Sequence, residues 1–270
     1  VGLSLYALLG GLRKENLFKR VRGEKLDQLE QTNLQKVYQY NDGQTNDVKL
    51  TKAVMFSAKA LGAELKCPAN IISIVKDERG FKVIYEEDDK EINIQAKVIV
   101  NAAGPWVNEL HELINPKVDS LDVDLVQGTH IIIDAPAPSG IYYLEAQDKR
   151  AVFVMPYEFK GELKTMIGTT EKLFQGKADD VKPSGEEVEY LLNIYKSYFP
   201  NHNNVNLLHE FAGLRVLPKD EGSMFSRPRD TVLHWATPGV LSLYGGKLTA
   251  YRSTSELVIK KIKPLLGKAR

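Results

Sequence analysis

The chain of 270 residues is long enough for one large domain or two of ordinary size, each with a substantial hydrophobic core. Its 36 basic and 35 acidic residues leave a net charge of +1, so no nucleic-acid partner is expected and any bound anion must be held locally. The single cysteine, Cys67, excludes an internal disulfide framework and is compatible with a reducing, cytosolic compartment.

The first hundred residues are predicted to contain helices and short strands. The apolar start, residues 1–10, is too short to span a bilayer and has the pattern of an amphipathic helix. Asn46 and Asp47 can cap a helix over 48–61, which Gly62 ends. Strand-like stretches follow at 64–66, 70–75, 81–86 and 91–95, and the last three are predicted to form a small antiparallel meander.

A strongly apolar strand over 96–100 ends in small residues, and Pro105 then begins a helix. A buried parallel strand whose carboxyl end carries small residues is where doubly wound folds bind their cofactors. Tight packing of the strand end against a neighbouring helix explains the same pattern. The segment alone therefore leaves both interpretations open.

Strand signals dominate from 123 to 233, at 125–126, 130–133, 141–143, 151–155, 165–168, 211–214 and 232–234. One helix, over 184–199, interrupts them. This pattern predicts a mainly antiparallel sheet inserted before the chain returns to its first domain. The expected fold is therefore a mixture of helix and sheet, with a doubly wound α/β domain and an inserted antiparallel β-sheet domain.

The last motif joins a short strand over 240–244 to a helix through Gly245, Gly246 and Lys247. Glycine lets a ligand approach the backbone closely, and the first N–H groups of a helix carry partial positive charge. Lys247 adds a full charge. The junction is predicted to hold an anionic or electron-rich ligand, and an ordinary glycine turn with a solvated lysine is the alternative.

Three of the motifs together resemble one family. N-A-A-G-P-W at Asn101, G-L-R-V-L-P at Gly213 and G-G-K-L-T-A-Y-R at Gly245 resemble the FAD-dependent glycerol-3-phosphate dehydrogenases, within the D-amino-acid oxidase superfamily. Four further motifs follow the order of that family: Q-G-T-H-I-I-I at Gln127, D-K-R-A-V-F-V-M-P-Y at Asp148, I-G-T-T-E at Ile167 and S-R-P-R-D at Ser226. The resemblance covers nearly the whole chain.

Two parts of the family pattern have no counterpart in the sequence. Members of the family begin with a G-x-G-x-x-G turn that holds the FAD pyrophosphate, and they end in a helical domain; neither has a counterpart here. The resemblance therefore implies a fragment of the enzyme with an incomplete FAD site. We expect this fragment alone to be inactive and to bind FAD weakly or not at all.

The resemblance implies oxidation of sn-glycerol 3-phosphate to dihydroxyacetone phosphate by hydride transfer to FAD, with the electrons passed on to a quinone. It implies a partial FAD-binding domain over 1–105 and 235–270 and a substrate-binding domain over 106–234. It also implies a cytoplasmic protein, or one with peripheral contact on the inner face of the cell membrane. A glycerophosphate oxidase that uses oxygen, an amine or amino-acid oxidase and a non-catalytic ligand-binding domain are the alternatives.

Site residues follow from the resemblance, position by position. His130 is the candidate acceptor of the substrate's hydroxyl proton, because the pKa of histidine lies near neutrality. Lys247 is the candidate that stabilises negative charge on the reduced flavin. The residues expected to bind the cofactor are Ala103, Gly104, Trp106, Gly245, Gly246, Lys247, Leu248 and Thr249. No metal is expected.

Arg215 and Arg229 are the candidates for binding the substrate phosphate, because a guanidinium group can bind phosphate oxygens bidentately. Arg215 is also counted as catalytic by motif match. A buried ion pair with Asp220 or Glu210 is the alternative for Arg215. Arg227 could exchange roles with Arg229.

Overall fold

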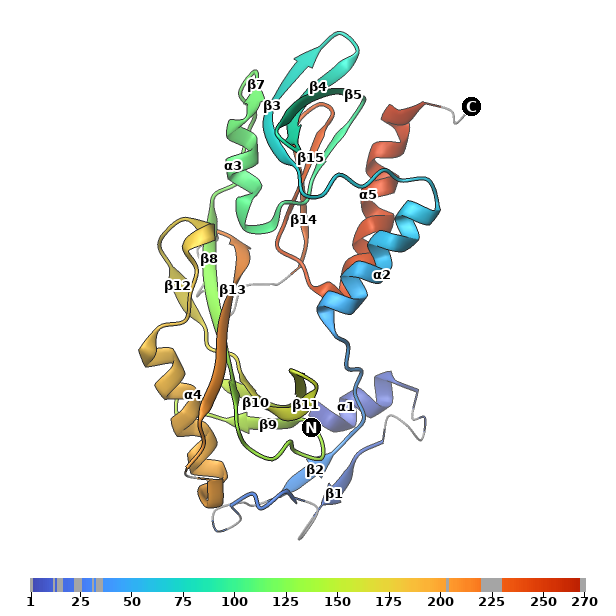
Figure 1. Ribbon diagram of the computed structural model, residues 1–270. Helices are drawn as coiled ribbons and strands as arrows, with labels where there is room; N and C mark the ends of the chain where they lie inside the picture. Colours follow the sequence, from blue (N-terminus) through green and yellow to red (C-terminus); the bar gives the residue numbers. More distant parts are fainter. Residues whose placement is uncertain are drawn as a thin grey trace. The chain divides into compact units, whose positions relative to one another are not determined.

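A computed structural model of the chain describes residues 2–11, 13, 17–21, 26–30, 32, 36–202, 204–219 and 230–267 (Figure 1). Contacts between residues divide the chain into two units. Unit 1 comprises Val1–Thr45, Gly128–Lys172 and Lys182–Gly213, and unit 2 comprises Asn46–Gln127, Leu173–Val181 and Leu214–Arg270. This division groups residues up to Thr45 with the sheet of unit 1, whereas the sequence grouped 1–105 with 235–270. The assignment of FAD-binding and substrate-binding domains stays a prediction.

Unit 1 is built on the predicted antiparallel sheet. Its strands lie in the order β12–β8–β11–β10–β9, and β13 also pairs with β8. The bounds are β8 Val123–Ile133, β9 Tyr142–Glu145, β10 Ala151–Phe159, β11 Glu162–Gly168, β12 Lys172–Phe174 and β13 Leu207–Pro218. The first segment of the unit adds α1 (Gly2–Leu9) and the paired strands β1 (Lys19–Val21) and β2 (Val37–Gln39).

His130 lies within β8, and its expected position at a strand start is wrong. The sequence interpretation broke the strand at the polar residues 127–129. In the structure Gln127 and Thr129 are buried and belong to a continuous strand. β8 pairs with β11 over residues 130–133 and also with β12 and β13, and as one strand it continues through the residues that local polarity marks as a break.

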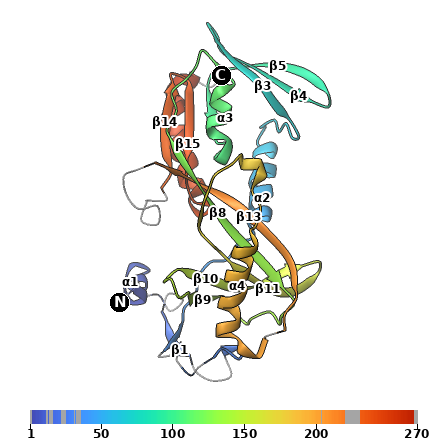
Figure 2. The same cartoon turned by 90° about the vertical axis from the view of Figure 1, so that its left-hand side faces the viewer.

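Helix α4 (Gly185–Tyr198) packs on one face of this sheet (Figure 2). It begins and ends where the sequence predicts. Ser184 caps it by accepting a hydrogen bond from the Glu187 N–H, and the Glu187 carboxylate accepts one from the Ser184 N–H in return. The core beneath the helix joins its apolar side chains to those of the sheet: Leu191, Ile194, Tyr195, Ile131, Ile133, Val152, Val154 and Ile167.

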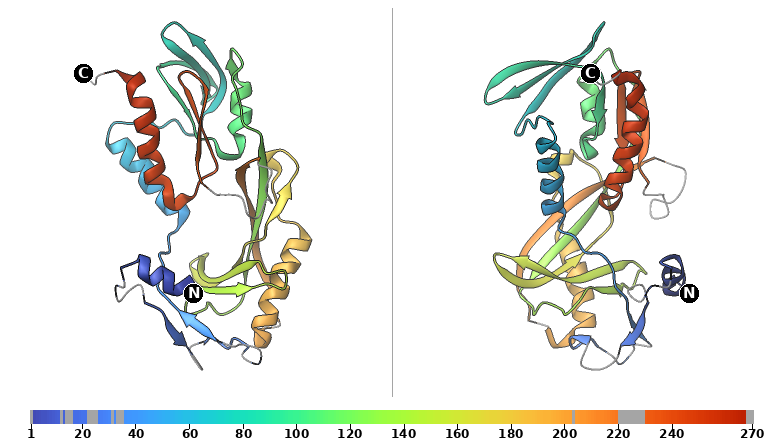
Figure 3. Two further views of the ribbon diagram at one scale, coloured as in Figure 1. Left: turned by 180° about the vertical axis from the view of Figure 1, so that it is seen from behind. Right: turned by 90° about the vertical axis from the view of Figure 1, so that its right-hand side faces the viewer.

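Unit 2 contains a sheet in the order β14–β15–β6, with bounds Val232–Thr237, Val240–Tyr244 and Ile99–Asn101. β14 and β15 are antiparallel, whereas β15 and β6 are parallel. Helix α5 (Tyr251–Leu266) packs against this sheet through Val258 and Ile262, which contact Leu241 (Figure 3). On the strand β15 the alternate residues Val240 and Tyr244 belong to other hydrophobic clusters, so both faces of this strand are covered.

The predicted meander is confirmed as β3 (Asn70–Asp77), β4 (Gly80–Glu87) and β5 (Lys90–Ala96), and the short β7 (Ile114–Asn115) pairs with β3 in parallel. The strand expected at 64–66 is not formed. All three residues are exposed, because a single apolar residue, Leu65, gives this stretch little surface to bury.

Helix α2 (Asp47–Ala60) is confirmed with Asn46 as its cap, where the Asn46 side chain accepts a hydrogen bond from the Lys49 N–H. None of its own residues is buried. Among the helices of the described ranges, none combines the length and apolar character needed to cross a bilayer.

Candidate functional site

Two strand-to-helix junctions of unit 2 lie at one edge of its sheet. β6 and β15 are parallel, with Asn101 paired to Ser242, so the carboxyl ends of both strands meet at that edge. The first junction leads into the 3₁₀ turn η3 (Gly104–Trp106) and α3 (Val107–Glu112). The second leads through Gly245–Lys247 into η7 (Leu248–Ala250) and α5. The edge therefore brings together all the residues expected to bind the cofactor.

The first junction is held by the buried side chain of Asn101. Its Oδ1 accepts a hydrogen bond from the Ala103 N–H at 3.1 Å, and its Nδ2 donates to the Val107 carbonyl at 2.9 Å. These bonds fix the turn between the strand and α3. Trp106 is 41% exposed and its indole N–H donates to Asp179 Oδ1 at 3.1 Å.

The second junction requires its two glycines. Gly245 and Gly246 have φ values of +69° and +109°, which residues with a side chain rarely adopt. A Cβ on Gly246 would lie 2.7 Å from Thr231 Oγ1, and one on Gly245 would lie 3.2 Å from the Val216 carbonyl oxygen. The whole stretch from Gly245 to Thr249 is exposed. The backbone of this turn and the Lys247 side chain are thus both accessible to a ligand.

Both junctions begin their helices without a side-chain cap. No side-chain hydrogen bond is present at the capping positions of η3, α3, η7 and α5, which are Ala103, Trp106, Lys247 and Ala250. The helices α2 and α4, by contrast, are capped by Asn46 and Ser184. Helix starts leave N–H groups without a partner inside the helix, so this edge of the sheet presents donors to a ligand.

Side chains of α3 tie this helix to β15 behind the edge. His111 Nε2 and Ser242 Oγ, both buried, lie 2.6 Å apart, and the Tyr244 hydroxyl donates to Asn108 Oδ1 at 3.0 Å. Burial lowers the pKa of His111 below its usual value, and the nearby His234 acts in the same direction. Sequence reasoning missed these residues, although Ser242, between Leu241 and Leu243 in an apolar strand, is a readable sign of a buried polar group that needs a partner.

Arg215 is half-buried in β13 and precedes Val216, whose carbonyl borders Gly245. The structure therefore brings the strand that carries Arg215 to the second junction. Arg227 and Arg229 lie outside the described residues, as does Asp220.

His130 belongs to unit 1, where its imidazole lies between two neighbours. On one side it stacks on Phe211, with ring centroids 5.1 Å apart and planes inclined by 8°. On the other side it covers Gly168, its partner across β8 and β11; a Cβ there would lie 2.1 Å from His130 Cδ2. Gly168 is therefore glycine for reasons of space. Sequence reasoning missed both neighbours, because only the pairing of β8 with β11 and β13 makes them adjacent.

The comparison with known families agrees with this arrangement. The family model described as "DAO: FAD dependent oxidoreductase" matches residues 4–252. The chain belongs to this family of FAD-dependent oxidoreductases. It is 31% identical over 98% of its length to the glycerol-3-phosphate dehydrogenase of Pseudomonas aeruginosa, and it covers 53% of that protein. It is 30% identical over 97% of its length to the D-erythritol 1-phosphate dehydrogenase of Brucella abortus, and it covers 54% of that protein.

The chain thus spans about half the length of the curated relatives it matches. Among solved structures, the glycine oxidase of Geobacillus kaustophilus has the same fold, with a TM-score of 0.65 and 18% identity. That match covers 96% of this chain and 66% of the glycine oxidase.

The carboxyl edge of β6 and β15 fits the FAD of this oxidoreductase family. FAD presents phosphate oxygens and ring carbonyl oxygens, all of which accept hydrogen bonds. The edge offers the complementary groups: uncapped helix N–H groups, an exposed glycine backbone and the Lys247 ammonium. A Cβ built on Gly104 would meet no atom within 4 Å, so the space beside the first junction is open.

Proposed function

We propose that the protein oxidises sn-glycerol 3-phosphate to dihydroxyacetone phosphate, with FAD as the hydride acceptor and a quinone as the final electron acceptor. One observation supports this above all. Relatives that match almost the whole chain at 30% and 31% identity are named for dehydrogenation of phosphorylated polyols. Quinones dissolve in membranes, so we further propose that the whole protein acts from the cytoplasm with peripheral contact on the inner face of the cell membrane.

In this proposal different residues act on different parts of the substrate. Arg215 and Arg229 hold the phosphate dianion, because guanidinium groups stay charged and bind its oxygens bidentately. FAD, when bound, supplies the acceptor for the hydride that leaves the carbinol carbon. His130 accepts the proton of the hydroxyl on that carbon. Lys247 supplies positive charge at the carboxyl edge of the sheet.

D-erythritol 1-phosphate is a second candidate substrate, because the relative of that name covers 97% of this chain. Both compounds combine a phosphate with a neighbouring polyol chain, so the roles of the arginines and of His130 are the same for either. The two candidates differ in the length of the polyol. A comparison of both substrates in one assay separates them.

The test is a turnover assay of the whole protein with each phosphate, using either a soluble quinone analogue or dissolved oxygen as acceptor. We expect dihydroxyacetone phosphate from glycerol 3-phosphate with the quinone analogue. Hydrogen peroxide formed at the same rate in its absence would contradict the quinone and indicate an oxidase. Faster oxidation of D-erythritol 1-phosphate would move the assignment to that substrate, and oxidation of neither phosphate would contradict the proposal.

A further inference from the structure

The segment Gly168–Glu171 connects His130 with helix α4. Gly168 ends β11 and forms the surface on which the His130 imidazole lies. Because the ring contacts the glycine backbone directly, any displacement of this segment displaces the support of the imidazole. The position of the ring therefore depends on the groups that hold residues 168–171.

Thr170 binds the segment to the residue that precedes His130. The Thr129 N–H donates to Thr170 Oγ1 at 2.9 Å, and the Thr170 N–H donates to the Thr129 carbonyl at 3.3 Å. Both threonines are buried, with exposed fractions of 2% for Thr170 and 0% for Thr129. The Thr170 side chain is thus part of the backbone pairing that fixes β8 beside His130.

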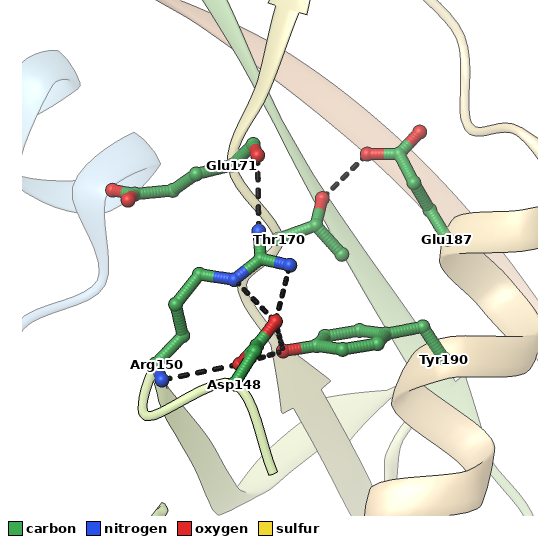
Figure 4. A network of polar contacts seen from close by, with 6 residues as sticks. All are labelled: Asp148, Arg150, Thr170, Glu171, Glu187 and Tyr190. Atoms are coloured by element: carbon green, nitrogen blue, oxygen red, sulfur yellow. Dashed lines mark hydrogen bonds and ion pairs between the residues drawn. The ribbon is translucent and has the colours of Figure 1, made fainter. Parts of the chain in front are cut away.

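The Thr170 hydroxyl is oriented by a carboxylate of α4. Since its oxygen accepts from Thr129, its proton is directed to Glu187 Oε1, 2.5 Å away (Figure 4). Glu187 is 5% exposed, and its Oε2 accepts from the Ser184 N–H and hydroxyl at 3.2 and 3.0 Å. Burying a carboxylate costs free energy unless its oxygens accept hydrogen bonds. Each of these donors therefore helps to keep Glu187 in place.

A second contact holds the other end of the segment. Arg150 Nη1 donates to the Glu171 carbonyl at 3.0 Å, and its guanidinium also binds Asp148 (Figure 4). Tyr190, one helical turn after Glu187, donates its hydroxyl to the same Asp148 at 3.0 Å. One face of α4 therefore supports two consecutive residues of the segment, Thr170 and Glu171.

We propose that Thr170 and Glu187 are positioning residues for His130, which they hold in the orientation needed to accept the substrate's proton. This inference rests on the proposed function, in which His130 has that role. Glu187 fixes the direction of the Thr170 hydroxyl, Thr170 fixes residues 129 and 168, and these place the imidazole against Phe211. The alternative is that Thr170 and Glu187 only stabilise the fold and the start of α4.

The experiment compares Thr170→Val, which removes the hydroxyl at nearly constant shape, with Thr170→Ser, which keeps it. Thr165→Val is the matched control, because Thr165 is a buried threonine of β11, the strand that leads into this segment, and its hydroxyl donates to the Pro136 carbonyl at 2.8 Å. Three quantities are measured in the whole protein: the melting temperature, the pH dependence of flavin reduction by glycerol 3-phosphate, and the NMR titration of His130 labelled at Cε1. His130→Gln assigns the NMR signal.

We expect Thr170→Val to slow flavin reduction on the order of tenfold at neutral pH, because a misplaced proton acceptor loses its alignment. The pH profile and the His130 titration should shift together, and Thr170→Ser should restore both. Thr165→Val should lower the melting temperature and leave both the profile and the titration as in the wild type. Equal shifts in Thr165→Val, or a wild-type profile and titration in Thr170→Val, would overturn the proposal. A shifted titration in a protein that glycerol 3-phosphate does not reduce would support the positioning of His130 and contradict the proposed function.

Discussion

Lys247 adds a full positive charge to an edge of the sheet where helix N–H groups contribute partial charges. It is exposed, adopts an extended backbone conformation with φ −121° and ψ 140°, and directly precedes the turn η7. The chain as a whole carries a net charge of only +1, so binding of an anion depends on such local groups. Full charge and helix N–H groups at one point act in the same direction.

Replacing Lys247 by methionine keeps the length of the side chain and removes its charge. We expect the rate of flavin reduction by glycerol 3-phosphate to fall on the order of 100-fold, as for loss of one preorganised donor. Stopped-flow absorbance measures this rate, and the flavin content of the purified protein is measured beside it. Lys260→Met, at an exposed lysine of α5, is the control and should react as the wild type. Equal rates of flavin reduction in both variants would contradict the proposed role of Lys247.

The sequence alone identifies candidate site residues that are neighbours along the chain. Gly245, Gly246 and Lys247 are contiguous, so the strand before them and the helix after them are enough to predict an exposed turn that can bind a ligand. Gly168 and Phe211 have no such signal. Their role arises because both lie beside His130 in the folded sheet, although neither is close to it in sequence.

At the scale of elements, α3 and β15 form the framework of the site. The pair His111–Ser242 and the pair Asn108–Tyr244 join the helix after the first junction to the strand before the second. The two junctions are therefore fixed relative to each other by buried hydrogen bonds, which resist local opening. Weakening either pair should loosen both junctions together.

The lowered pKa of His111 makes this framework sensitive to pH. Its folded pKa lies below the ordinary value of 6.5, so its stabilising contribution is complete above that value and is lost as the pH falls below it. We expect His111→Gln, which cannot titrate, to be less stable than the wild type at about pH 8 and to lose less stability on going to about pH 5.5. Thermal melting of both proteins at the two pH values measures this. An equal loss in both proteins would contradict the assigned shift.

Elements with local start and stop signals could be predicted from the sequence. The cap Asn46 correctly placed the start of α2, and the helical pattern over 184–199 correctly placed α4. The turn that ends at Gly80 placed the hairpin of β3 and β4. The pairing of β6 with β15 could not be derived in this way, because it joins strands from distant parts of the chain. The break in β8 that its polar residues suggest is wrong, because hydrogen bonding to neighbouring strands and burial stabilise the strand more than local polarity disfavours it.

At the scale of the whole molecule, the carboxyl edge of the sheet gathers segments that are far apart in sequence. Residues 101–106 and 242–250 meet there because β6 and β15 are parallel neighbours, and β13 carries Arg215 to the same junction. Such an edge is where open α/β sheets bind their ligands. The family and its fold follow from this architecture together with the match over residues 4–252, while the substrate and the acceptor belong to the whole protein.

The central claim is that this edge holds an FAD that a phosphorylated polyol reduces. The most direct measurement is the visible spectrum of the whole protein before and after anaerobic addition of glycerol 3-phosphate. We predict an oxidised flavin band that bleaches on addition of this substrate and returns when a quinone analogue is added. A protein without a flavin band, or one whose band is unchanged by glycerol 3-phosphate and bleached by an amino acid, would contradict the account.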